Sequence, residues 1–131
     1  MELAVQKAIY DALVAAGMTV RDDVPMPDDA ADSADFPYVT VGDATYEPFD
    51  TDDSIGADAV AEVHAWSRYA GRKEVKELQE QIYNALHHVA LNVAGFHLLT
   101  CDFISSETSL EDDGKTRSGV SRFRVLIDET A

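Results

Sequence analysis

The pattern closest to a metal-binding loop in this sequence is Asp50, Asp52 and Ser54, which place oxygen ligands at alternate positions. A calcium-binding helix–loop–helix loop that starts at Asp50 would also need a glycine at position 55 and a bidentate glutamate at position 61. The sequence has Ile55 and Ala61 at these positions, and no helix is expected on either side. The spacing therefore favours a solvated acidic loop over a specific calcium site.

Neither the histidines nor the serines form a recognisable catalytic or metal-binding motif. His87 and His88 are adjacent in an expected helix, where neighbouring side chains point about 100° apart and cannot easily share one metal ion. No serine sits in a nucleophile elbow, and Gly71-Arg72-Lys73 lacks the upstream glycine of a phosphate-binding loop. We therefore expect no catalytic residue, no metal and no cofactor.

Length and composition predict a single globular domain over residues 1–131. Cys101 is the one cysteine, which excludes an internal disulfide and a cysteine zinc site, and we expect it to be a small buried side chain in a strand. No run of about 18 apolar residues occurs, and the start of the chain lacks the pattern of a secretory signal. We therefore expect no membrane contact and a protein made in a cytoplasm.

The formal net charge of −15 is distributed unevenly along the chain. Residues 22–67 contain 13 carboxylates and neither lysine nor arginine, and all 10 basic residues lie outside that range. A negative field of this size repels nucleic-acid phosphates and argues against a DNA-reading protein. It fits either a solvated surface that aids solubility, or a surface that must stay clear of DNA or meet a basic partner.

Apolar periodicity predicts two helices among several strands. The first helix has a stripe that includes Val5, Ile9 and Leu13, and Gly17 follows it as a left-handed cap. The expected order is a helix over residues 2–16, strands over 18–21, 38–46 and 58–68, a helix over 71–90, and strands over 96–104 and 119–127. This order predicts an α+β domain in which the two helices cover one face of a mainly antiparallel sheet of about four to five strands.

Two acidic segments, at about residues 22–36 and 47–57, interrupt this pattern and are expected to be loops. The first is rich in proline and aspartate and shows no periodicity. The second should form the tip between two sequential antiparallel strands. A further turn is indicated by Asp112-Asp113-Gly114, which precedes the last strand.

Five residues are candidates for contact with another subunit. Trp66 is the only tryptophan, and a tryptophan in a strand usually belongs to the core and otherwise anchors an interface. Basic residues are scarce, so those near the strands either pair with acids on their own surface or meet the acidic 22–62 region of a neighbouring copy. These basic candidates are Arg68, Arg72, Arg122 and Arg124.

A family resemblance is carried by short segments spread over almost the whole chain. They are Glu2–Leu13, Val24-Pro25, Phe36–Gly42, His64–Arg68, Gly71–Glu74, and the closing hairpin from Asp113 to Arg124. In this order they resemble the tail-completion family of long-tailed bacteriophages and related gene-transfer particles, also described as tail-terminator or tail-to-head joining proteins. Each segment alone is weakly specific, and together they are fairly specific. The acidic segment 22–36 is a departure, because the family's usual connection is shorter.

The resemblance implies a structural virion protein. Members of this family form a ring, commonly six-fold, on the head-proximal end of the tail tube. The ring stops tube polymerisation and offers a surface to the head connector, while DNA passes through its centre. The implied partners are other copies of the chain, the tail tube protein and the head–tail connector protein, with DNA only as passing cargo. The implied location is the neck region of a virion assembled in the host bacterial cytoplasm.

A ring also fits the charge pattern. Head-to-tail contacts join two different faces of a subunit, and separate acidic and basic blocks could make these faces complementary. Acidic residues in the lumen would let DNA slide without binding. The candidates for such a lumen-facing or partner-facing position are Asp50, Asp52 and Asp53. Two other functions stay open, a head-side connector or adaptor ring protein and, from a different class, a small-molecule-binding α+β domain.

Overall fold

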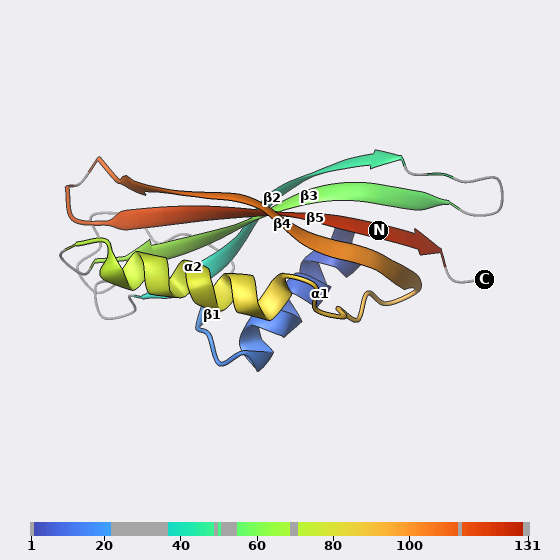
Figure 1. Cartoon of the computed structure of the whole chain (residues 1–131), viewed down its shortest axis with the longest axis horizontal. Helices are drawn as coiled ribbons and strands as arrows, with labels where there is room; N and C mark the ends of the chain where they lie inside the picture. Colours follow the sequence, from blue (N-terminus) through green and yellow to red (C-terminus); the bar gives the residue numbers. More distant parts are fainter. Residues whose placement is uncertain are drawn as a thin grey trace.

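Two helices and five strands make up the computed structural model, which describes residues 2–21, 37–48, 50, 55–68, 71–112 and 114–129 (Figure 1). The elements are α1 (Glu2–Ala15), β1 (Val20–Arg21), β2 (Tyr38–Pro48), β3 (Gly56–Ser67), α2 (Lys73–Leu86), β4 (Phe96–Leu110) and β5 (Arg117–Glu129). One sheet contains the strands in the order β1-β2-β3-β5-β4. Since β1 is parallel to β2 and all other neighbours are antiparallel, the predicted α+β fold is confirmed.

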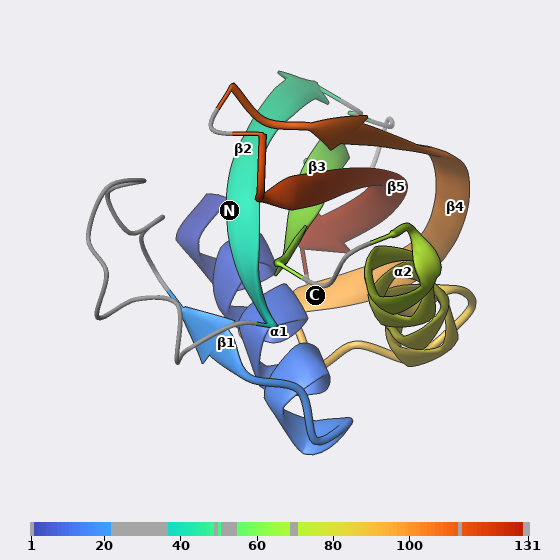
Figure 2. The same ribbon diagram turned by 90° about the vertical axis from the view of Figure 1, so that its left-hand side faces the viewer.

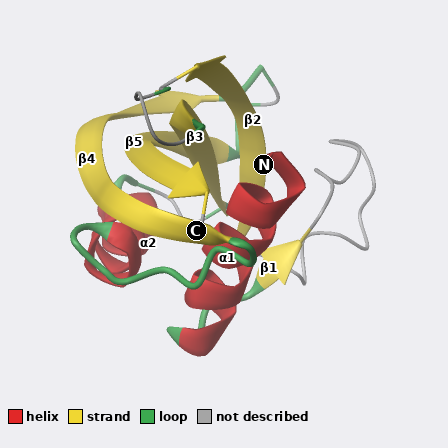
Figure 3. Cartoon of the chain, turned by 90° about the vertical axis from the view of Figure 1, so that its right-hand side faces the viewer, coloured by secondary structure: helices red, strands yellow, loops and turns green. Residues whose placement is uncertain are grey.

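Both helices lie on the same side of the sheet, as the two views along its length show (Figures 2 and 3). α1 packs against β1 and β2, and α2 packs against β3, β4 and β5. Apolar side chains at three- and four-residue spacing turn one stripe of each helix towards the strands. The buried members of the two stripes are Val5, Ala8, Ile9, Leu13, Val75, Ile82 and Leu86. These stripes and the strands beneath them form the hydrophobic core.

Alternation along β3 gives the sheet two faces of different character. Ala57, Ala59, Ala61, Val63 and Ala65 are buried, whereas the alternate residues Asp58, Val60, Glu62, His64 and Trp66 are only half-buried. Successive side chains of a strand point to opposite faces, so one set faces the helices and the other faces away. We call these the covered face and the open face. The open face includes Asp58, Glu62, His64 and Trp66 of β3, and Arg122 and Arg124 of β5. Across these two strands, Glu62 pairs with Arg122 and Asp58 pairs with Arg124.

The second helix is shorter than predicted, because it ends at Leu86 and not near residue 90. His87 is extended, with φ −68° and ψ 119°, and His88 has a positive φ of 57°. The backbone N–H of His88 donates to the carbonyl of Cys101 at 2.8 Å and ties the chain to β4. This tertiary hydrogen bond replaces the helical one, so the apolar pattern that continues to Val89 does not extend the helix.

The first strand is shorter than predicted, because β1 contains only Val20 and Arg21 of the expected 18–21, whereas β2, β4 and β5 are longer than predicted and take residues from the expected loops. β2 runs to Pro48 and β3 begins at Gly56, so the acidic tip predicted at 47–57 contains fewer residues than expected.

Gly17 (φ 85°) caps α1 and Gly114 (φ 70°) lies in the β4–β5 hairpin, as their sequence contexts predicted. The acidic segment 22–36 lies outside the described residues. In the described ranges, no helix has the length and apolar character needed to cross a membrane.

Cys101 is a small buried side chain of β4, as predicted, with 3% of its surface exposed. Burial, together with the negative charge of Asp102, raises the pKa of its thiol to about 12. The thiolate is the reactive form of cysteine, so this side chain is chemically inert at neutral pH.

Candidate interface on the open face of the sheet

Trp66 lies on the open face and is half-buried, so the expectation that it belongs to the hydrophobic core was wrong. It is the middle member of an aromatic column. The Trp66 ring stacks on Tyr38 with centroids 6.4 Å apart, and on His64 with centroids 6.0 Å apart. Its indole Nε1 donates to Oγ1 of Thr40 at 3.1 Å. The column spans β2 and β3 and leaves part of a large aromatic surface available for contact.

A close backbone approach at Gly42 supports this column. β2 has a bulge between Val41 and Ala44, opposite Glu62 of β3. The His64 ring lies over the bulge, and a Cβ atom added at Gly42 would be only 2.6 Å from His64 Cδ2. The small residue therefore lets His64 lie flat against β2, next to the Trp66 ring.

The other half of the open face carries a ladder of ion pairs that we define by Asp58, Glu62, Glu107, Arg122 and Arg124. Arg122 donates from Nε to Glu62 at 3.0 Å and from Nη2 to Glu107 at 3.1 Å. Arg124 binds Asp58 through two hydrogen bonds, of 3.0 Å from Nε and 2.6 Å from Nη2. Both arginines stand on β5 and their acids on β3 and β4, so the ladder joins three neighbouring strands.

These contacts shift the titration of the groups involved. The hydrogen bonds from Arg124 hold the pKa of Asp58 below its usual value of 3.8, against the opposing effect of burial. The pKa of Arg124 is raised by its hydrogen bonds to Asp58, and that of Arg122 is raised mainly by its hydrogen bond to Glu107. The two arginines thus pair with acids of their own chain, which was one of the two arrangements considered from the sequence.

Arg68 and Arg72 lie apart from the ladder, where β3 leads into α2. Arg68 Nε donates to Oγ1 of Thr116 at 3.2 Å, and Ser67 Oγ donates to Glu74 at 2.7 Å. Arg72 is the N-cap residue of α2, is exposed, and makes no side-chain capping hydrogen bond. The positive end of the helix dipole disfavours a cation at this position. The structure therefore divides the five candidates into an open-face group and a pair at this joint.

The acidic tip between β2 and β3 is described only at its margins. Asp50 is exposed, and its Oδ1 accepts a hydrogen bond from the backbone N–H of Gly56 at 3.2 Å. Asp52 and Asp53 lie outside the described residues. Ile55 is 52% exposed, and its carbonyl accepts from the N–H of Glu129 at 2.9 Å. An exposed isoleucine is thus held among acidic side chains at this end of the sheet.

The described residues contain one cluster of metal-type ligands, formed by His87, His88 and Asp102. The two imidazole rings are stacked, with centroids 3.8 Å apart and planes 22° apart. A metal ion binds in the plane of an imidazole ring, and two nearly parallel planes do not meet at bonding distance. In addition, Nδ1 of His87 accepts from the N–H of Phe103, and Nε2 of His88 pairs with Asp102 at 2.9 Å. The cluster is therefore suited to fixing the end of α2 on β4.

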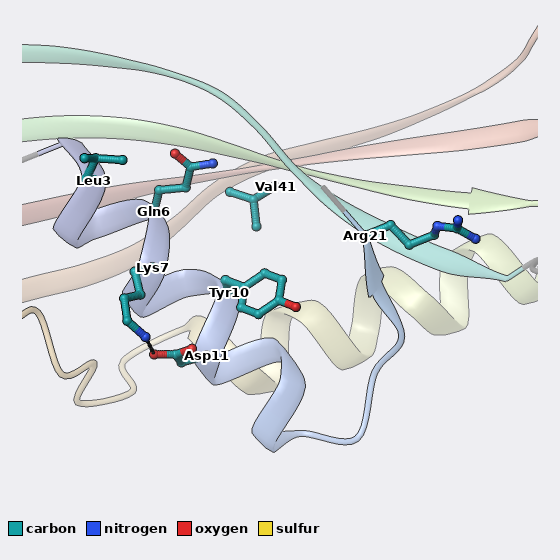
Figure 4. A pocket seen from close by; sticks show the side chains of 7 residues that line it. All are labelled: Leu3, Gln6, Lys7, Tyr10, Asp11, Arg21 and Val41. Atoms are coloured by element: carbon teal, nitrogen blue, oxygen red, sulfur yellow. Dashed lines mark hydrogen bonds and ion pairs between the residues drawn. The ribbon is translucent and has the colours of Figure 1, made fainter. Parts of the chain in front are cut away.

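A groove that the sequence interpretation missed runs between α1 and β2 (Figure 4). It has a volume of about 480 Å³ and is lined by Leu3, Gln6, Lys7, Tyr10, Asp11, Arg21 and Val41. Lys7 and Asp11 form an exposed ion pair at 2.9 Å. The sequence does contain a pattern that could have indicated this groove. Leu3, Tyr10 and Val14 recur at helical spacing outside the core stripe of α1, and all three are exposed.

Comparisons with known proteins give one consistent result. The family model described as tail completion protein gp17 matches residues 7–128. The tail completion protein gp17 of Bacillus phage SPP1 is 27% identical over 92 residues, which are 70% of this chain and 68% of that protein. A chain in a solved structure described as the virion of a native gene transfer agent particle has the same fold, with a TM-score of 0.78. The two are 21% identical, and the match covers 94% of this chain and 93% of the other.

Proposed function

This chain belongs to the tail completion protein gp17 family, and we propose that its copies form a ring at the head-proximal end of a phage-type tail. In this proposal the ring ends polymerisation of the tail tube and joins the tail to the head connector, with DNA passing through its centre. The observation that carries the proposal is the family match over residues 7–128, which includes α2, the strands β1 to β4 and all of β5 except Glu129. Its place is the neck of a virion.

We further propose that the protein acts by assembly and has no enzymatic activity. The groups that most often do chemistry have structural partners. His64 lies 3.4 Å from Glu62 and His97 lies 3.4 Å from Asp128. His87 and His88 fix the end of α2, and the Cys101 thiol is buried with a raised pKa. Each of these side chains is therefore already used by the fold.

The open face and the adjoining β3–α2 joint are the proposed assembly surface. Trp66 offers a half-buried aromatic surface of the kind that anchors interfaces. Arg72 is an exposed cation that its own helix dipole disfavours, which suits a residue that meets an external acidic group. Arg122 and Arg124 are paired within the chain, so they would present an ordered charged ladder and not free charges. Arg68 would hold the joint against Thr116.

Negative-stain imaging and sedimentation of the purified protein, with and without tail tubes, test the proposal. We expect rings, or a monomer that closes into a ring on one end of the tube, and tubes that stop growing when the protein is added. A monomer under all salt conditions, even with tail tube protein present, would contradict it. Binding to head-side connector rings without any binding to tube ends would instead identify a connector-side adaptor.

The acidic tip is proposed to face either the lumen or a partner. Asp50, Asp52 and Asp53 can be replaced together by asparagine, which removes their charge at nearly constant volume. A lumen position predicts slower DNA delivery by particles that assemble normally, because DNA would no longer be repelled there. A partner-facing position predicts weaker assembly. Particles unchanged in both respects would remove the tip from either role.

A further inference from the structure

We propose that the turn formed by His87 and His88 is an acid-released latch, which holds the end of α2 on the edge of β4 only while His87 is neutral. These two residues are called the latch below. The inference is independent of the proposed ring, because it concerns contacts within one chain. It starts from the way in which the turn is bonded to the strand.

Three contacts join the two latch residues to three consecutive residues of β4. The backbone N–H of His88 donates to the carbonyl of Cys101 at 2.8 Å. Nε2 of His88 pairs with Asp102 at 2.9 Å, and the backbone N–H of Phe103 donates to Nδ1 of His87 at 3.0 Å. Since β4 is an edge strand, the two backbone groups are occupied here by the latch and cannot pair with another strand. The Cys101 thiol is buried and stays neutral, so it adds no charge at this point.

The latch has a backbone conformation that depends on these contacts. Among the described residues, His88 is the only one other than glycine with a positive φ, which is 57°. A residue with a side chain rarely adopts such a φ unless the surrounding structure holds it there. The contacts with β4 provide this support, so the loss of one of them favours release of the whole turn.

The hydrogen bond from Phe103 determines where His87 carries its proton. A ring nitrogen that accepts a hydrogen bond has no proton of its own, so neutral His87 must carry its proton on Nε2. A second proton can therefore be added only to Nδ1. There it converts the acceptor into a donor that faces the N–H of Phe103. Protonation of His87 thus removes one bond of the latch and leaves two donors opposite each other.

The charged and titratable groups around the ring act in the same direction. The ring centroids of Tyr83 on α2 and of His88 lie 4.6 Å and 3.8 Å from that of His87. Asp102 of β4 has a carboxylate oxygen within 4.8 Å of a ring nitrogen of each histidine, and Arg124 of β5 stands opposite it in the register. Because Asp102 is bonded to His88, it balances a positive charge on that ring first. A further proton on His87 then places two cations in stacked rings, which repel each other.

Hydrogen exchange of the full chain, followed by mass spectrometry of its peptides, tests the latch. Between about pH 8 and about pH 5, the range in which imidazoles titrate, the protection of the His88 and Phe103 amides should fall. We expect a fall of about tenfold relative to the unfolded-state rate at each pH, the size expected for one hydrogen bond. Residues 57–65 of β3 should keep their protection, because they lie in the interior of the sheet.

Two variants make the test specific to His87. In His87→Asn, the amide oxygen can accept from Phe103 in place of Nδ1 and does not titrate in this range. Protection at the latch should therefore stay constant with pH in this variant. The matched control is His97→Asn, since His97 also lies on the β4 side of the sheet and pairs with a different acid, Asp128. This variant should lose protection at the latch as the native protein does.

Four results would overturn the inference. The first is unchanged protection at the latch of the native protein down to about pH 5. The second is an equal fall in His87→Asn, because another group would then be titrating. The third is a fall along the whole chain, which would show global unfolding by acid and not local release. The fourth is a loss of protection that a chelator produces at pH 8, which would assign the turn to a bound metal ion.

Discussion

The covered and open faces of the sheet use the same strands for different purposes. On β5, Phe123 is fully buried under the helices, while its neighbours Arg122 and Arg124 stand on the open face in ion pairs. On β3, alanines and valines face the helices, while Glu62, His64 and Trp66 face away. Burial of apolar surface dominates folding, and exposed ion pairs contribute little to stability. The contrast indicates that stability depends on the covered face, which leaves the open face free for assembly.

Truncation of a covered-face residue should have the largest effect on stability. Phe123 has no exposed surface and packs edge-on against Phe103, with ring centroids 5.6 Å apart. We expect Phe123→Ala to lower the free energy of unfolding by about 3–5 kcal/mol, because it leaves a cavity in the core. Urea denaturation followed by circular dichroism measures this. Arg122→Ala, one residue away on the open face, is the matched control, and an equal loss in both variants would abolish the distinction between the faces.

Trp66→Ala should have an intermediate effect on stability and a larger one on assembly. The substitution removes two ring contacts and leaves Oγ1 of the buried Thr40 without its indole partner. We expect a loss of about 2 kcal/mol in the free energy of unfolding, since Trp66 is only half-buried. If the proposed assembly surface is correct, the folded variant should also fail to form rings or to bind tube ends.

The conservative variant Trp66→Phe separates the two effects. Phenylalanine keeps an aromatic surface but, like alanine, cannot donate the hydrogen bond to Thr40. We therefore expect the two variants to have similar free energies of unfolding, and Trp66→Phe to form rings better than Trp66→Ala. Rings that form equally well in all three proteins would remove Trp66 from the interface. Loss of tube binding with rings intact would assign it to the tube contact and not to contact between copies.

Gly42→Ala tests how the open face is kept in place. A Cβ atom would lie 2.6 Å from Cδ2 and 2.7 Å from Nε2 of His64, so the imidazole ring must move. Because the end of a side chain can shift more easily than backbone, we expect a cost of only about 1 kcal/mol. Near-ultraviolet circular dichroism of Trp66 should change, because His64 stacks on it. An unchanged tryptophan signal would show that the column does not depend on the bulge.

The position of Trp66 shows how much of this arrangement could be predicted from the sequence. The alternation over 57–67 predicts both the strand and its faces, because every second residue is alanine or valine as far as Ala65. The same alternation puts Trp66 on the opposite face. The general preference of tryptophan for cores led to the wrong interpretation, although the local pattern contained the answer.

Other features depend on contacts that no local pattern contains. The end of α2 is set by a hydrogen bond from His88 to Cys101, which is 13 residues further along the chain. The ladder depends on the register of β3 with β5, which brings Asp58 opposite Leu126 and next to Arg124. The groove beside α1 is lined by residues of α1 together with Arg21 and Val41, which come together only through the pairing of β1 with β2. The order of elements could therefore be predicted, but the surfaces formed by their edges and registers could not.

We expect the smallest effect on stability when an ion pair of the ladder is broken. The dependence of this effect on pH distinguishes it from the effects of the other substitutions. The pKa of Asp58 is lowered in the folded protein by the hydrogen bonds from Arg124, so folding favours the ionised carboxylate. This contribution is fully present above the unfolded value of 3.8 and is lost as the pH falls through the lower folded value. Arg124→Met, which removes both charge and donors, should therefore be less stable than the native protein at neutral pH, and the difference should shrink below pH 3.8.

Urea midpoints of the two proteins across this range measure the difference, and Asp58→Asn, which cannot titrate, provides the control. In the Asp58→Asn background, the effect of Arg124→Met on stability should depend much less on pH, and what dependence remains reflects the weaker interactions of Arg124 with Asp102 and Glu47. Curves that stay parallel down to acid pH in the native background would show that the Asp58–Arg124 pair contributes nothing to folding. Arg124 would then be available for assembly without any cost to the fold, while Arg122 would still be held by Glu62 and Glu107.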